Sequence, residues 1–124
     1  MERRIKSRNL AERIAEVIHS KQGKDIVVYD VREMASFTDY IIIATLNSDV
    51  QIRAVLKELS RKIKTPGFHV EGEASGGWVL LDYDYVIVNL FFPNERRFYG
   101  LERLWGEAEL LDINNVRERH RAKT

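Results

Sequence analysis

The feature that most constrains the fold is a pair of nearly continuous apolar runs, rich in β-branched residues, at residues 26–31 and 40–45. Runs of this length and composition predict β-strands. Because neither run alternates regularly with polar residues, helices on both sides or a partner chain are expected to cover both faces of the sheet. Two further runs, at residues 78–82 and 85–92, are separated by a short polar turn and predict a hairpin.

Two stretches have the period of amphipathic helices. Apolar residues recur every three or four positions over residues 8–21, and again from Ser48 to the break at Thr65-Pro66-Gly67. Ser48 and Gln51 have the spacing of a capping box, in which each side chain satisfies a backbone N–H group at a helix start. The sequence therefore predicts one helix before the first strand and one after the second.

The C-terminal half predicts the remaining elements. A short strand is expected near residues 68–70, and an apolar stripe through residues 101–108 has the spacing of a last helix. The predicted order is α-β-β-α-β-β-β-α, an α/β fold with a five-stranded sheet flanked by helices. Since 124 residues suit one domain, we expect a single domain over residues 1–124, with a basic tail at residues 115–124 that is disordered or helical.

Composition excludes several classes of site. The chain has no cysteine, which excludes disulfides, a thiol nucleophile, an iron–sulfur cluster and a cysteine zinc site, and fits a cytoplasmic protein. No apolar stretch has the length of a signal peptide or a membrane span, so no membrane partner is expected. Residues 1–64 carry 13 lysines and arginines against 9 acidic residues, whereas residues 71–109 carry 3 against 8. This uneven charge suits a polar partner surface better than bulk nucleic acid.

Catalytic and metal-binding patterns are sparse. The three histidines lack the spacing of metal ligands and no glycine-rich phosphate loop is present, so no metal or cofactor is expected. Asp82 and Asp84 form the best enzymatic candidate, because two carboxylates two residues apart on a strand are able to hold a divalent cation against a nucleotide phosphate. The alternative is a hairpin turn, in which aspartate side chains accept hydrogen bonds from nearby backbone.

A row of cations follows one face of the second predicted helix: Arg53, Lys57, Arg61 and Lys64. Cations at this spacing suit contacts with phosphates. The alternative is a solvated face opposite the apolar stripe.

Aromatic residues gather near the C-terminus. Eight of the twelve aromatic residues fall within residues 78–105, which also belong to the acidic part of the chain. Most are expected in the core. A hairpin and helix this rich in Trp and Tyr also has the composition of a binding hot spot, and a homodimer that buries the aromatic patch against itself is a further alternative.

Separated motifs along the chain complete the sequence pattern: Asp30-Val31-Arg32, Ser36 to Thr45, Ser48, Glu71-Gly72, Trp78 to Tyr83, Val86-Ile87-Val88 and Phe98 to Trp105. With these motifs in this order, the chain resembles the ribosomal silencing factor family, RsfS or Iojap, over about residues 8–108. The resemblance implies a mixed sheet related to the nucleotidyltransferase fold, without the catalytic signature of that superfamily. It therefore implies a binding protein with no reaction of its own.

The resemblance also implies a partner and a mechanism. Members of the family dock on the large ribosomal subunit at its universal protein number fourteen and sterically block joining with the small subunit, so that translation falls when nutrients are short. Acidic side chains near the aromatic residues would pair with a basic ribosomal protein. The basic first half of the chain would then be able to turn toward rRNA.

Residue by residue, the resemblance assigns ten partner-facing positions. They are Glu71, Trp78, Leu80, Asp82, Tyr83, Arg97, Tyr99, Leu101, Glu102 and Trp105. Two positions depart from the family pattern, which usually has glycine in place of Leu46 and histidine in place of Asn89. The first departure concerns the loop before Ser48, and the second concerns an inward-facing strand position.

Overall fold

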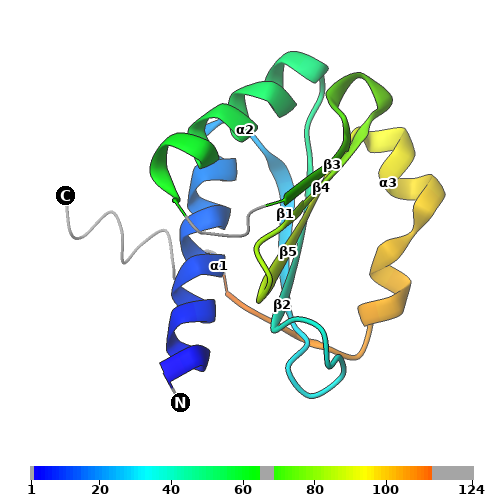
Figure 1. Cartoon of the computed structure of the whole chain (residues 1–124). Coiled ribbons are helices and arrows are strands. Elements are labelled where there is room, and N and C mark those ends of the chain that lie inside the picture. Colours follow the sequence, from blue (N-terminus) through cyan, green and yellow to red (C-terminus); the bar gives the residue numbers. More distant parts are fainter. Residues whose placement is uncertain (1, 65–68, 113–124) are drawn as a thin grey trace.

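The structure is a computed structural model that describes residues 2–64 and 69–112, with six strands in one mixed sheet and helices on both faces (Figure 1). The elements in chain order are α1 (Glu2–Ser20), β1 (Lys24–Asp30), β2 (Tyr40–Thr45), α2 (Asp49–Lys62), β3 (His69–Glu73), the 3₁₀ turn η1 (Ala74–Gly76), β4 (Trp78–Asp82), β5 (Val86–Phe91), α3 (Pro93–Tyr99), the 3₁₀ turn η2 (Leu101–Trp105) and β6 (Glu109–Leu110).

The strand order is β3-β4-β5-β2-β1-β6. β2 and β5 run parallel at the centre, and every other neighbouring pair is antiparallel. The mixed α/β sheet and the hairpin of β4 and β5 were therefore predicted correctly. The strand count was not, because the two-residue strand β6 pairs with Tyr29 and Asp30 and adds a sixth strand at one edge. So short a strand leaves no periodic signal in the sequence.

The predicted last helix through residues 101–108 was also wrong. A helix does form in this region, but it begins at Pro93 and ends at Tyr99, where Gly100 adopts a left-handed conformation with φ of 57°. A residue in this conformation ends an α-helix, and glycine adopts it without steric cost. Only a short 3₁₀ turn follows, and the backbone N–H of Ala108 closes on the carbonyl of Trp105.

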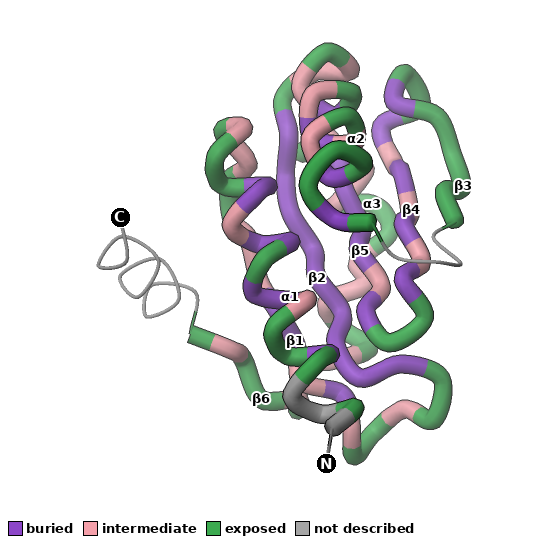
Figure 2. The backbone as a smooth tube through the Cα atoms, turned by 60° about the vertical axis from the view of Figure 1, so that its left-hand side comes forward, coloured by how far each residue is buried: buried purple, intermediate pink, exposed green. Residues whose placement is uncertain are grey.

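Both faces of the central strands are covered, as the apolar runs predict. One side of the sheet packs against α1 and α2, and the other against α3 and η2 (Figure 1). All six residues of β2 are buried, whereas all five residues of β3 are exposed (Figure 2). The helices therefore do not cover β3, and part of one sheet face is open to solvent.

The second helix begins at the predicted cap, although Gln51 bonds the N–H of Asn47 in place of that of Ser48. The hydroxyl of Ser48 accepts a hydrogen bond from the backbone N–H of Gln51 at 3.2 Å, and the side-chain oxygen of Gln51 accepts from Asn47 N–H at 2.7 Å. Just before the cap, Leu46 is 1% exposed and belongs to the core on the helix side. Leu46 therefore adds apolar packing beneath the loop.

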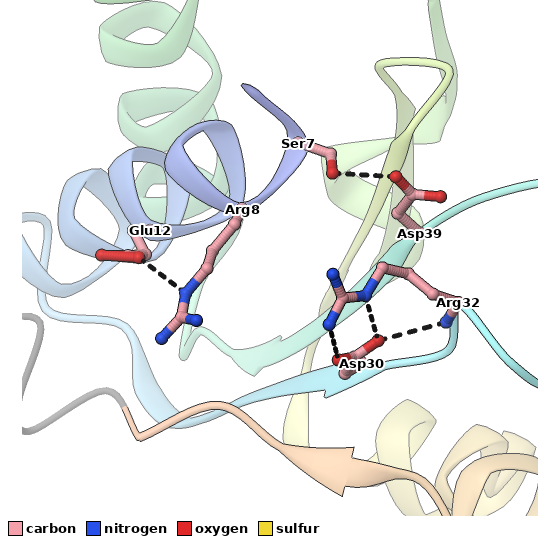
Figure 3. Close-up of polar contacts among 6 residues, drawn as sticks. All are labelled: Ser7, Arg8, Glu12, Asp30, Arg32 and Asp39. Carbon is pink, nitrogen blue, oxygen red and sulfur yellow. Dashed lines mark hydrogen bonds and ion pairs between the residues drawn. The ribbon is translucent and has the colours of Figure 1, made fainter. Parts of the chain in front are cut away.

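Polar contacts hold α1 against the sheet (Figure 3). The buried carboxylate of Asp39 accepts hydrogen bonds from Ser7 at 2.8 Å and from Arg3 at 2.9 Å. Beside it, Arg32 donates from two guanidinium nitrogens to Asp30, at 2.9 and 2.7 Å, and this pairing lowers the pKa of Asp30. The bonds of Asp39 therefore join the first two turns of α1 to the start of β2.

No helix in the described part of the chain is both long enough and apolar enough to cross a bilayer. The basic tail predicted at residues 115–124, and the Thr65-Pro66-Gly67 break, lie outside the described residues.

Candidate partner-binding surface

Strand alternation defines the open part of the sheet. Val79 and Leu81 of β4 face α1 and α2 in the core, so Trp78, Leu80 and Asp82 face the opposite side. The register of the edge pairs places Glu73 beside Trp78, Glu71 beside Leu80 and His69 beside Asp82. We call the surface formed by Glu71, Trp78, Leu80, Asp82 and Tyr99 the open sheet face.

An aromatic stack borders the open sheet face. The ring of Trp78 lies 5.0 Å from Phe91 and 4.4 Å from Tyr99, between centroids. Phe98 meets Tyr99 edge-on at 5.1 Å. Phe91 is fully buried, Trp78 is half-buried, and Tyr99 and Phe98 are 48% and 82% exposed. The stack therefore runs from the core to the surface and presents rigid aromatic area to a partner.

A hydrogen bond fixes the orientation of Trp78. Its indole Nε1–H donates to the side-chain oxygen of Asn89 at 3.0 Å. Asn89 is 3% exposed and lies on the adjacent strand β5. Asn89 therefore supplies the acceptor that a largely buried indole N–H requires.

Arg96 anchors α3 to the sheet. Its guanidinium donates to Glu102 at 2.8 Å, to the hydroxyl of Thr45 at 2.9 Å and to the backbone carbonyl of Asp25 at 2.7 Å. Only 11% of this side chain is exposed. Because these acceptors belong to η2, β2 and β1, one side chain sets where Tyr99 sits above Trp78.

The remaining C-terminal positions divide by role. Leu101 and Trp105 are partly buried and pack against the core on this side of the sheet, which contains Tyr29, Ile41 and Ile43. Glu102 is committed to the ion pair with Arg96, whereas Arg97 is exposed and donates to Asn94 on its own helix. Leu101 and Trp105 therefore support the surface from below more than they form it.

Tyr83 does not belong to this surface. It is 2% exposed and lies in the core cluster against α1 and α2, and this burial raises its pKa to about 12. The signal that separates it from Trp78 is present in the sequence, because residues an odd number of positions apart on a strand face opposite sides. We therefore correct the assignment of Tyr83 from a partner-facing to a core residue.

The turn alternative for Asp82 and Asp84 is confirmed. The carboxylate of Asp82 accepts a hydrogen bond from the backbone N–H of Asp84 at 2.7 Å, and Asp84 has a φ of 74°. This is the side-chain-to-backbone bond by which aspartate closes turns. Within residues 2–64 and 69–112, no three His, Asp or Glu side chains gather as a metal site would require.

Sequence reasoning missed several exposed apolar side chains around this surface. Leu104 is 64% exposed, although helical spacing placed it in the core, and Phe37 is 57% exposed while its ring lies 6.3 Å from Trp105. Gly100 marks the end of α3, but it does not predict that the segment after it forms a 3₁₀ turn. These side chains add exposed apolar area around η2, on the side of the sheet that α3 and η2 cover.

Comparison with known proteins connects this surface to a family. The family model described as "Ribosomal silencing factor during starvation" matches residues 4–124. The chain belongs to the ribosomal silencing factor family. Among relatives, it is 36% identical to ribosomal silencing factor RsfS of Bacillus subtilis over 97 residues, which cover 76% of this chain and 82% of that protein.

A plant relative and a solved structure agree with the assignment. The chain is 31% identical to the chloroplastic protein Iojap of Zea mays over 111 residues, 85% of this chain and 47% of that protein. A crystal structure of a Chromobacterium violaceum protein superimposes with a TM-score of 0.70 at 31% identity and covers 80% of this chain and 85% of that one. The chain therefore shares its fold with this structure, and its family membership rests on both sequence and structure.

Proposed function

We propose that this silencing factor binds the large ribosomal subunit, at its universal protein number fourteen, through the open sheet face. The exposed aromatic stack of Trp78, Phe98 and Tyr99 beside an acidic strand edge is the observation that carries the proposal. Aromatic anchors surrounded by polar side chains are typical of protein interfaces. Glu71 and Glu73 are exposed on the edge strand and complement a basic ribosomal protein.

Binding at this position would act by occupying space. A standard interface removes about 800 Å² of surface from each partner, and a 14.5 kDa body held in this way is large enough to block the small subunit. Steric exclusion requires affinity and no chemistry, so we infer that the protein is not an enzyme. Subunit joining takes place in the cytoplasm, where we place the protein.

Two further contacts belong to the proposal. A peripheral contact with rRNA would accompany docking on the ribosomal protein. A homodimer would bury part of the same aromatic surface and compete with docking. Tyr99→Glu tests the dimer, because sedimentation at an unchanged mass would exclude the aromatic surface as the dimer contact.

The experiment that tests the function is co-sedimentation with separated ribosomal subunits, followed by a subunit-joining assay at raised magnesium. The intact protein is expected to sediment with large subunits alone and to reduce the fraction of joined ribosomes. Tyr99→Ala should lose at least tenfold in affinity for the isolated ribosomal protein, as expected for a hot-spot residue.

Tyr85→Ala is the matched control. Tyr85 is also a partly exposed tyrosine, 39% exposed, but it lies at the turn between β4 and β5 with Arg3 over its ring at 4.0 Å. Tyr85→Ala should leave the affinity for the isolated ribosomal protein near the value of the intact protein. Equal affinities of the two variants, or no binding of the intact protein to large subunits, would overturn the proposed surface.

A further inference from the structure

Charge separates between the two layers of the molecule. Six cationic side chains are exposed on α1, on α2 and directly after α2: Arg13, Arg53, Lys57, Arg61, Lys62 and Lys64. We call these six residues the basic helical face. Of the carboxylates described on α1 and α2, Glu12 is buried, and Glu16, Asp49 and Glu58 are only partly exposed. The outer surface of this layer is therefore dominated by positive charge.

Ion pairs within the layer leave a surplus of cations. Glu58 lies 2.7 Å from Arg61, 3.8 Å from Lys62 and 3.9 Å from Lys21, so one carboxylate is shared among three cations. Glu12 is occupied by Arg8 at 3.3 Å (Figure 3). Surface pairs of this kind are weak and exchange readily for a stronger anionic partner.

The two helices bring their cations together at one end. The guanidinium of Arg13 on α1 donates to the backbone carbonyl of Lys62 at the end of α2, at 3.0 Å. Both residues line a shallow pocket of about 160 Å³. From Arg53 to Arg61 the α2 row extends for about 12 Å, at 1.5 Å per residue. A row of this length matches several consecutive phosphates of a nucleic-acid backbone.

The geometry points to double-stranded RNA as the partner of the basic helical face, contacted through its phosphates without regard to sequence. This inference rests on the proposed function, because the ribosomal subunit supplies the RNA. An anionic lipid surface fits less well, since interfacial helices insert a broad apolar face. Here the apolar stripe of α2, through Ile52, Val55 and Leu59, is buried in the core.

Acidic residues on the other layer give the contact a direction. Glu71 and Glu73 are exposed on β3, and their pairing with Leu80 and Trp78 places them on the side of the sheet away from α1 and α2. Repulsion from phosphates keeps that side off RNA. The protein partner and the RNA would therefore occupy opposite layers at the same time.

Binding of the full chain to a fluorescent A-form RNA duplex, followed by anisotropy over a salt series, tests the inference. Lys57→Gln combined with Lys64→Gln should lower the affinity about tenfold or more at 0.1 M salt and make the log–log salt slope shallower by about two. The matched control, Lys24→Gln with Arg103→Gln, removes two exposed cations outside the helical layer and should change both quantities far less.

The outcomes separate this inference from the proposed function. Equal affinities and slopes of the two double variants would overturn it, as would stronger capture by anionic phospholipid vesicles than by the duplex. Absence of duplex binding by the intact chain at 50 mM salt would do the same. The Lys57 and Lys64 double variant should still bind the isolated ribosomal protein, so failure of the RNA contact leaves the open sheet face to be judged by Tyr99→Ala.

Discussion

Trp78 and Asn89 are joined across β4 and β5 by a 3.0 Å hydrogen bond from the indole N–H to the amide oxygen. Asn89→Leu would leave the indole donor without this acceptor, and we expect it to lower the free energy of unfolding by about 1–3 kcal/mol. Asn89→His should lose less, because a neutral imidazole nitrogen is able to accept the same bond. Urea denaturation of the two variants measures the difference, and equal losses would contradict the role of this bond.

Arg96 is expected to be the most important cation for the folded state. Arg96→Ala removes three hydrogen bonds that join α3 to η2, β2 and β1. Since hydrogen bonds to charged groups contribute about 1.5–3 kcal/mol each and are not additive, we expect a loss of roughly 2–4 kcal/mol. Thermal and urea unfolding would report it.

Arg97→Ala is the control for this loss. The residue is adjacent on the same helix, but it is exposed and bonds only to Asn94 among the described side chains. Surface changes of this kind stay within about 0.5 kcal/mol. Similar losses at the two positions would show that Arg96 does not anchor the segment.

An element can be predicted from the sequence when side-chain burial determines it, but not when local backbone conformation does. The run through Ile41, Ile42 and Ile43 predicts a doubly covered strand because burial on both faces requires apolar side chains at every position. The segment after Gly100 was misread because Leu101, Leu104 and Trp105 satisfy helical spacing equally well in a 3₁₀ turn. Local backbone conformation decided between the two, and a hydrophobic pattern does not encode it.

The candidate surface shows the same limit. Composition singled out Trp78 and Tyr99, but only tertiary packing places Tyr99 over Trp78, through an arginine that pairs with residues 71 and 51 positions away in sequence. Phe98 is adjacent to Tyr99 and is far more exposed. Neighbouring helical residues point in different directions, so which of the two covers the sheet follows from how α3 is docked.

Because Tyr83 is buried, we expect the protein to lose stability in alkaline solution. The pKa of Tyr83 is raised to about 12 by burial, whereas a tyrosine in the unfolded chain titrates near 10. The unfolded state therefore releases this proton first. Stability from the neutral phenol is complete below pH 10 and falls as the pH rises from 10 to 12, by up to about 2 kcal/mol.

Urea unfolding at pH 8 and pH 11 measures this effect. Tyr83→Phe should show a smaller difference between the two pH values than the intact protein, whatever its stability at pH 8. Tyr29 and Tyr40 also have raised pKa values because of burial, so part of the alkaline loss should remain. An unchanged pH dependence in the variant would contradict the burial of an ionisable phenol at this position.

We expect that Gly72 on the edge strand β3 tolerates no side chain. A substitution there should affect both stability and binding. Gly72 has a φ of 90°, and an added Cβ would meet the backbone oxygen of Trp78. Gly72→Ala should therefore destabilise the protein by about 2 kcal/mol or more. The clash also pushes β3 away from β4 and displaces Glu71, so affinity for the large subunit should fall in the fraction that remains folded. Gly76→Ala meets nothing within 4 Å and is the control, expected within about 0.5 kcal/mol. Equal stability of the two variants in urea would show that the edge strand adjusts freely.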